Sequence, residues 1–266
     1  MSNFKYQNHN IHYEIYGEGK PLVILNGIMM STISWHQFLQ ELSKNNQIIL
    51  VDFIDQGKSD AYKGEFYTYS FQTEMLRELF DYLKLNKVNI ASISYGGQIA
   101  LDFSSKYPKR VEKLILFNTT SYINEWMTEI FDLWLAAGKT RNGEIYYRAT
   151  IPTIYSSTFF KEQIKWMKDR EKLLIPLFSD EVFLDKMERL VLSTKNLNLF
   201  EQLKNITADT LIVASTEDYL TPIKAQEEMH KEIKNSNYIL IPNAGHASMY
   251  EKPKLFISLI LGFINN

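Results

Sequence analysis

The chain has 266 residues, a formal net charge of −2, 45% hydrophobic residues and no cysteine. Its length suits one α/β domain with an insertion, or two small domains, and is enough to bury a sizeable core. The small net charge predicts no nucleic-acid-binding surface, and the lack of cysteine excludes disulfides, thiolate chemistry and zinc–sulfur sites.

The first part of the chain predicts strands that alternate with helices. Residues 4–7 and 10–16 alternate in polarity, with Ile11, Tyr13 and Ile15 on one side, which predicts two antiparallel strands. Buried strands are then expected at 21–25, 47–51, 88–93 and 113–117, with helices at about 34–44, 69–83 and 95–107. This alternation predicts a mostly parallel sheet with helices on both faces.

The alternation stops at 122–205, where no buried strand is predicted. Helical patterns there carry many large apolar side chains, among them Trp126, Ile130, Trp134, Tyr146, Tyr147, Trp166, Met167, Met187 and Leu190. We therefore divide the chain into a core in two parts, 1–120 and 207–266, and a helical insertion at 121–206. Some aromatic residues of the insertion should roof a pocket, and Trp126 and Trp134 are our candidates for substrate binding.

Strands and helices resume after the insertion. We expect a strand at 210–214, a helix that opens at Thr221-Pro222, a strand at 238–241 and a final helix after Pro253. Asp218 lies four residues past the first of these strands, and His246 lies in the loop after the second. Because ligands gather at the carboxyl ends of strands in open α/β sheets, both side chains should reach one edge of the sheet.

Ser94 lies at a third strand end, in a predicted strand, sharp turn and helix. Such a turn brings adjacent elements so close that only small residues fit two positions before and after its apex, here Ser92 and Gly96. The start of the helix also supplies unpaired N–H groups and a positive dipole end, which stabilise an oxyanion beside the serine.

These residues resemble the α/β-hydrolase superfamily, and within it the capped serine esterases. The segment from Ser92 to Gly96 is similar to the family's G-x-S-x-G nucleophile elbow, with Ser92 in place of the first glycine. The chain order Ser94, Asp218, His246 is also the order used in that family. The resemblance covers essentially the whole chain and implies an α/β-hydrolase fold with a helical cap insertion.

The resemblance also implies roles for these side chains. A serine hydroxyl is protonated at neutral pH, so His246 would take its proton during attack, and Asp218 would orient and stabilise the imidazole. By resemblance, the backbone N–H groups of Ile28 and Tyr95 would form the oxyanion hole. Asn26 and Gly27, where the family commonly has His-Gly, are candidates for the substrate-binding loop.

Two features leave alternatives open. Asp55 lies in a loop that departs from the family's Asp-x-Arg-Gly-x-Gly-x-Ser pattern; it is a candidate reserve acid or substrate contact, although a loop-capping role is favoured. A substrate with a carboxylate would require an arginine in the pocket. The insertion offers Arg141, Arg148, Arg170 and Arg189 for that purpose.

The sequence thus predicts a carboxylesterase that cleaves a small-to-medium, largely apolar ester through an acyl-serine intermediate and needs no cofactor. The alternatives are hydrolysis of a thioester, a lactone or a carbon–carbon bond by the same three residues, or a slow-turnover ligand sensor. No metal is expected, because the other histidines lack ligand spacing. Without an apolar leader or a membrane-length apolar run, we expect a cytoplasmic protein whose partner is its small-molecule substrate, with no nucleic acid or membrane.

Overall fold

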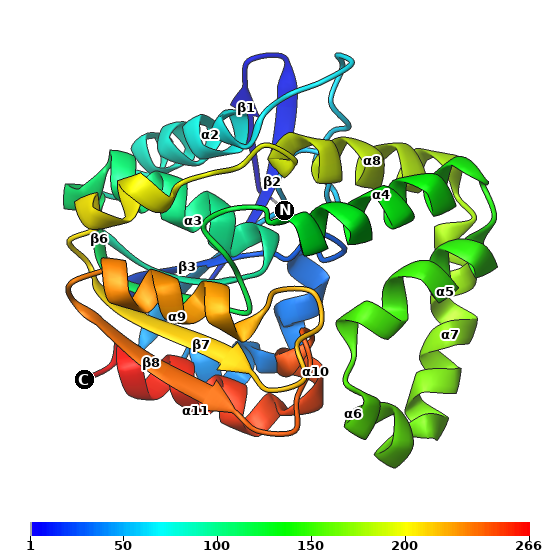
Figure 1. Ribbon diagram of the computed structural model, residues 1–266. Helices are drawn as coiled ribbons and strands as arrows, with labels where there is room; N and C mark the ends of the chain where they lie inside the picture. Colours follow the sequence, from blue (N-terminus) through cyan, green and yellow to red (C-terminus); the bar gives the residue numbers. More distant parts are fainter. Residues whose placement is uncertain (1) are drawn as a thin grey trace.

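A computed structural model describes residues 2–266 and contains one eight-stranded sheet in the order β1-β2-β4-β3-β5-β6-β7-β8 (Figure 1). The strands are β1 Ser2–Tyr6, β2 His9–Tyr16, β3 Lys20–Leu25, β4 Asn46–Val51, β5 Val88–Ile93, β6 Val111–Phe117, β7 Asp209–Ser215 and β8 Ser236–Ile241. The pairs β1–β2 and β2–β4 are antiparallel, and all the others are parallel. This confirms the α/β class and the mostly parallel sheet.

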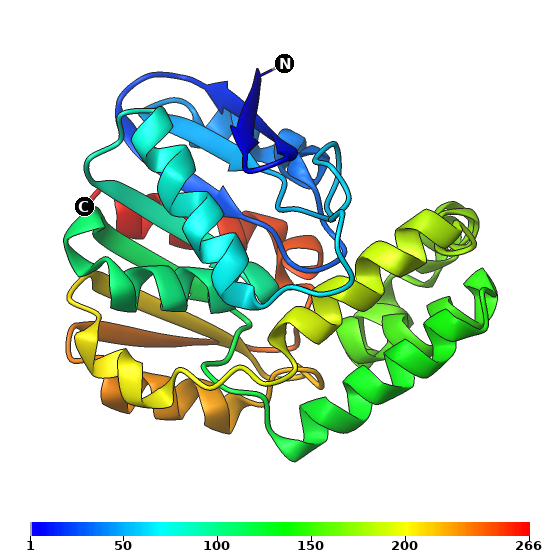
Figure 2. The same ribbon diagram turned by 90° about the horizontal axis from the view of Figure 1, so that it is seen from above.

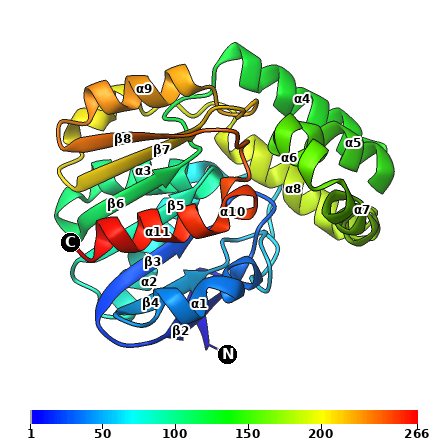
Figure 3. The same cartoon turned by 90° about the horizontal axis from the view of Figure 1, so that it is seen from below.

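Helices cover both faces of this sheet (Figures 1 and 3). On one face lie α2 Tyr69–Tyr82, α3 Tyr95–Lys106 and α9 Ile223–Glu232, and on the other lie α1 Leu39–Leu42 and α11 Pro253–Ile264. Each face buries its own apolar cluster: the rings of Phe80 and Phe103 lie 5.1 Å apart in the first, and those of Trp35 and Phe256 lie 6.0 Å apart in the second. The predicted two-faced covering is therefore confirmed.

The structure differs from the sequence pattern in two local details. The segment predicted as a helix at 34–44 is a 3₁₀ helix, Thr32–Phe38, followed by the single turn α1; β-branched Thr32 and Ile33 at its start favour an α-helix poorly. Ile15, on the same side of β2 as Ile11 and Tyr13, is 44% exposed, whereas those two are buried. It lies beyond the last residue of β2 that pairs with β1, at an open edge of the sheet.

Five helices, α4 to α8, lie between β6 and β7 in the chain and project from the carboxyl ends of the strands (Figure 2). They are α4 Glu125–Lys139, α5 Gly143–Ile154, α6 Ser157–Glu162, α7 Ile164–Phe178 and α8 Glu181–Thr194. Large side chains pack inside this group, for example Tyr146 edge-on against Phe178 at 5.1 Å. Short 3₁₀ helices, Pro108–Arg110 and Phe200–Asn205, and the turn α10, Ser248–Glu251, complete the described elements.

Among residues 2–266, the helices are all either too short or too polar to cross a lipid bilayer. The molecule has two parts: the sheet with its covering helices, and the group of helices α4 to α8, which lies over the carboxyl ends of the strands.

Candidate active site

Ser94 occupies a strained turn between β5 and α3. Its φ is 54° and its ψ is −121°, a backbone conformation that residues other than glycine rarely adopt. The turn is held from within by the Gly97 N–H, which donates to the Ser94 carbonyl at 2.8 Å, and from outside by the Thr119 hydroxyl, which donates to the same oxygen at 2.8 Å. These bonds keep the serine hydroxyl at the carboxyl edge of the sheet.

Crowding around the turn explains its small residues. A Cβ atom at Gly96 would lie 2.6 Å from the carbonyl oxygen of Leu25 and 2.7 Å from that of Asn26, so no side chain fits there. Ser92, which departs from the family pattern, is fully buried, and its hydroxyl donates to the Ile115 carbonyl at 2.9 Å. The neighbouring strand therefore satisfies the polar group that serine adds in place of glycine.

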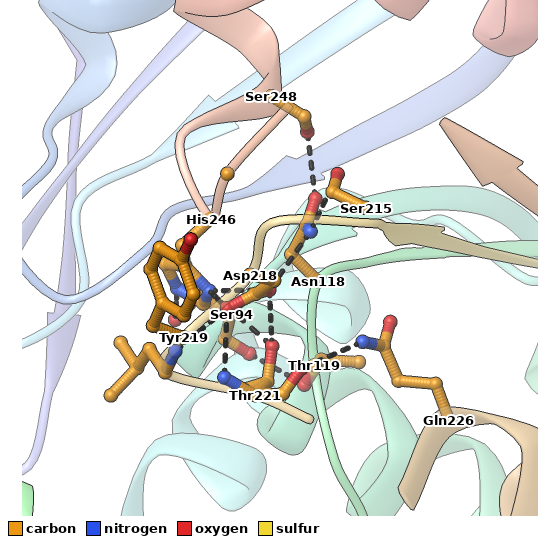
Figure 4. Close-up of polar contacts among 12 residues, drawn as sticks. Ser94, Asn118, Thr119, Ser215, Asp218, Tyr219, Thr221, Gln226, His246 and Ser248 are labelled. Atoms are coloured by element: carbon orange, nitrogen blue, oxygen red, sulfur yellow. Dashed lines mark hydrogen bonds and ion pairs between the residues drawn. The ribbon is translucent and has the colours of Figure 1, made fainter. Parts of the chain in front are cut away.

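Ser94, His246 and Asp218 lie in one hydrogen-bonded chain (Figure 4). The Nε2 atom of His246 is 2.8 Å from the Ser94 Oγ atom, and its Nδ1 atom is 3.0 and 3.2 Å from the two oxygens of Asp218. Since an ionised carboxylate only accepts hydrogen bonds, Nδ1 carries the proton and Nε2 is free to accept one from the serine. Residues that are 152 and 28 positions apart thus meet as general base catalysis requires.

The Asp218 carboxylate is buried but well supplied with donors. The backbone N–H groups of Leu220 and Thr221 and the Thr221 hydroxyl donate to it at 2.9, 2.8 and 2.6 Å, and the Asn118 amide donates at 2.9 Å. Burial acts to raise the pKa of Asp218, but the charge and hydrogen bond of His246 and the bonds from Thr221 outweigh it and lower the pKa. The carboxylate therefore stays ionised at neutral pH.

Asn118 is a member of this network that the sequence analysis missed. It follows β6, so Ser94, Asn118, Asp218 and His246 come after four successive parallel strands. Its amide also donates to the Ser215 hydroxyl, and its carbonyl accepts from the Ser248 hydroxyl at 2.7 Å. The sequence did contain a signal for Asn118: it is a polar residue that directly follows a predicted strand, and the other three residues also follow strands.

The predicted oxyanion-hole residues lie at the same place. Ile28 follows β3, Tyr95 is the first residue of α3, and both line a cavity that reaches Ser94. Within residues 2–266, neither backbone N–H donates to a carbonyl outside the regular helix and strand ladders. Both groups are therefore available to a negatively charged oxygen beside Ser94.

Two cavities meet at Ser94, between the sheet and the helical insertion. The first, which we call the main cavity, has an empty volume of about 700 Å³ including its opening to solvent, and Ser94, His246, Gly27 and Trp134 line it. The second, the side cavity, has an empty volume of about 330 Å³, also including open solvent, and shares Ile28, Ser94, Trp134 and Leu220 with the first.

Two predicted substrate-binding residues lie outside both cavities. Trp126 is 54% exposed, and its indole N–H donates to the Tyr219 carbonyl at 2.7 Å, so it links α4 to a core loop at the surface. Asn26 is fully buried beneath the loop, where its amide bonds the Val51 carbonyl and accepts from the Trp35 indole at 2.7 Å. These two placements correct the prediction, whereas Gly27 and Trp134 line the main cavity as expected.

Asp55 supports the structure and does not contact His246. Its carboxylate accepts from the Tyr62 N–H at 3.0 Å and forms a two-pronged ion pair with Arg189 of α8, at 2.9 and 2.6 Å. This favours the loop-capping role and adds a bridge from the core to the insertion. Arg141 pairs with Asp185 and Arg148 with Glu171, so of the four candidate arginines Arg170 is the one that lines the main cavity.

A buried carboxylate, Glu251, joins the helical insertion to the loop of His246. One of its oxygens accepts from the Ser156 N–H at 2.8 Å, and the other accepts from the Ser156 hydroxyl at 2.6 Å and the Gly245 N–H at 2.9 Å. A Cβ atom at Gly245 would lie 2.5 Å from the Ser156 nitrogen, which explains the glycine before His246. On the far side of the histidine, the Ala247 N–H donates to the Ile154 carbonyl at 3.0 Å. The segment between α5 and α6 thus holds the histidine loop on both sides.

Replacing Glu251 with glutamine is expected to lower kcat by about 10- to 100-fold, because the amide N–H₂ would face one of the two backbone N–H donors and displace the loop, and small displacements of reacting groups have effects of that size. Steady-state kinetics on any substrate that the wild type turns over measures it. Glu217→Gln is the matched control, since the Glu217 side chain bonds the neighbouring Ser157 and Thr158 and makes no hydrogen bond to the histidine loop. Equal losses in both variants would contradict a specific role for Glu251.

No cluster of three or more histidine, aspartate or glutamate side chains within residues 2–266 is arranged to hold a metal ion. The chemistry that the described site offers is that of its own side chains and backbone: a serine hydroxyl, an imidazole that can accept its proton, an ionised carboxylate and two available N–H groups. This set is suited to nucleophilic attack on a carbonyl carbon.

The chain is similar to known proteins in both sequence and fold. Residues 20–253 match the family described as alpha/beta hydrolase fold. MGS-M2, an alpha/beta hydrolase enzyme from a Medee basin deep-sea metagenome library, is 43% identical, with a TM-score of 0.98 over 100% of this chain and 98% of that chain. A Bacillus subtilis (strain 168) protein provisionally named 2-succinyl-6-hydroxy-2,4-cyclohexadiene-1-carboxylate synthase is 28% identical over 96% of each chain. The enol-lactonase from Burkholderia xenovorans LB400 shares the fold, at 20% identity and a TM-score of 0.86 over 100% of each chain.

Proposed function

We propose that this chain is a serine hydrolase that cleaves carboxylic esters. It belongs to the alpha/beta hydrolase fold family, and the similar protein MGS-M2 is an alpha/beta hydrolase enzyme. The observation that carries the proposal is the 2.8 Å contact between the Ser94 hydroxyl and the His246 Nε2 atom at the junction of two cavities. A nucleophile, its base and space for substrate are thereby brought together.

The reaction follows from these positions. The Ser94 oxygen attacks the ester carbonyl while His246 takes its proton, and the N–H groups of Ile28 and Tyr95 bind the resulting oxyanion. When the tetrahedral intermediate collapses, the bond to the alcohol oxygen breaks and His246 returns the proton to that oxygen, which leaves an acyl group on Ser94. Water then gives a proton to His246 and attacks the acyl carbon; as the bond from that carbon to the Ser94 oxygen breaks, His246 returns the proton to the serine oxygen and the acid is released. Asp218 keeps the imidazole oriented and stabilises its charged form.

The two cavities support an ester of small to medium size. An ester has an acyl side and an alcohol side, and the main and side cavities, which have largely different linings, both include Ser94. Apolar side chains from the insertion and the core line most of the main cavity, among them Met29, Ile151, Ile154, Leu174, Leu177 and Phe178. We propose that α4 to α8 act as a cap that shapes this space.

The proposal is tested with purified protein and 4-nitrophenyl esters of short acids. We expect release of 4-nitrophenol and, with a 4-nitrophenyl phosphonate in place of the ester, a stoichiometric covalent adduct on the peptide that contains Ser94, detected by mass spectrometry. His246→Ala is the control and should slow both reactions, because the serine then lacks its base. Labelling at another residue, or hydrolysis without labelling, would refute the proposal.

A further inference from the structure

The main cavity contains a cation that no part of the proposed reaction uses. Arg170 of α7 lines this cavity together with Ser94 and His246. Its guanidinium carbon lies 4.7 Å from the ring centre of Tyr250 and 5.2 Å from that of Trp166. Among the described residues that line this cavity, Arg170 is the one permanent cation, and none is an aspartate or a glutamate.

Arg170 also lacks the ion pair that the other arginines of the insertion have. Arg141, Arg148 and Arg189 each contact a carboxylate, whereas within residues 2–266 no carboxylate pairs with Arg170. Its Nε atom is buried and has no hydrogen-bond partner in the described part of the chain. Arg170 is half-buried, so its guanidinium has given up part of its hydration, and its buried Nε atom has no replacement partner; an acceptor supplied from outside would complete this site.

We propose that Arg170 binds a carboxylate group of the substrate, so that the preferred ester carries a negative charge on the part that occupies the main cavity. The planar guanidinium presents paired N–H donors that match a carboxylate, and the two aromatic rings hold it in place. The side cavity, lined by Met127, Phe131 and Trp134, is left for the apolar part. The assumption that the substrate is an ester rests on the proposed function, whereas the anion site depends on Arg170 itself.

The test compares two pairs of esters that differ in charge but not in the bond cleaved. One pair varies the acyl side, mono-4-nitrophenyl glutarate against 4-nitrophenyl valerate, and the other varies the alcohol side, 4-acetoxybenzoate against 4-methylphenyl acetate. In at least one pair, the wild type should have the higher kcat/KM for the anionic ester. Arg170→Met should lower that selectivity ratio by about 10- to 100-fold, the usual range for losing a hydrogen-bonded charge.

Arg141→Met, which removes a paired surface arginine of the insertion, is the matched control and should leave both ratios unchanged. Arg170→Lys keeps the charge but loses the paired donors, so its selectivity ratio should fall between those of the wild type and Arg170→Met. If Arg170→Met does not fold, a lower ratio in Arg170→Lys than in the wild type supports the inference, and an equal ratio overturns it. Ratios equal to those of the wild type in both pairs would overturn the inference, as would equal losses on the charged and neutral esters.

A binding measurement separates failure of the anion site from failure of the proposed function. If none of the four esters is hydrolysed, the proposed function fails, and calorimetric titration of Ser94→Ala with glutarate and with 4-methylbenzoate then judges the anion site. Binding that Arg170→Met removes from the Ser94→Ala protein supports the site. Equal affinity with and without Arg170, or no binding of either acid to Ser94→Ala, overturns it.

Discussion

Ser94→Ala is expected to lower kcat for ester hydrolysis by about 10⁴-fold or more, because removing the nucleophile of such a group of residues commonly has effects of that size. The loss should fall on kcat rather than on substrate affinity, since the cavities that bind the ester are otherwise unchanged. Steady-state kinetics of the variant, with equilibrium binding of a product acid as the second readout, measures both. A near-normal kcat in Ser94→Ala would contradict an acyl-serine mechanism.

The strained backbone at Ser94 provides a second readout of the same position. Alanine keeps the unfavourable φ of 54°, whereas glycine adopts it freely. We therefore expect Ser94→Gly to be about 1 kcal/mol more stable to unfolding than Ser94→Ala, although both lack activity. Denaturant titration measures this difference. Equal stability would mean that the turn carries no strain that glycine can relieve.

Asp218→Asn is expected to lower kcat by about 10⁴-fold with little change in fold, the size of effect seen when an acid that orients a catalytic imidazole becomes an amide. The amide would offer an N–H₂ group to the His246 Nδ1 atom, 3.0 Å from one carboxylate oxygen, and so favour the tautomer that has its proton on Nε2. That tautomer has no free acceptor for the serine proton. Steady-state kinetics and circular dichroism measure activity and fold.

Asp55→Asn is the matched control for Asp218→Asn. Asp55 is also buried and also follows a strand, but it pairs with Arg189 and not with His246. This variant should retain kcat within a few-fold and unfold more easily, because a two-pronged ion pair loses one of its charges. A loss of activity comparable to that of Asp218→Asn would identify Asp55 as the acid that serves the histidine instead.

The core of the fold could be predicted because its signals are local. Buried β-branched runs such as the one before Ser94 and the alternation of strands with helices depend on residues that are neighbours in the chain. Ser94, Asp218 and His246 each follow such a run. The sequence alone therefore predicts that they lie at one edge of the sheet. The 3₁₀ start at Thr32 and the exposure of Ile15 were missed because they depend on how the ends of elements pack.

The amino-acid sequence by itself therefore determined the class of fold, the sharp turn at Ser94 and three polar side chains at strand ends, because steric demand and periodicity act between residues close in the chain. Only the tertiary structure decided which side chains share the cavity. It turned Trp126 to the surface, paired Asp55 with Arg189, brought Asn118 to Asp218, and left Arg170 facing the same space as Ser94. Those outcomes follow from packing between segments that are distant in the chain, for which no short stretch of residues carries a signal.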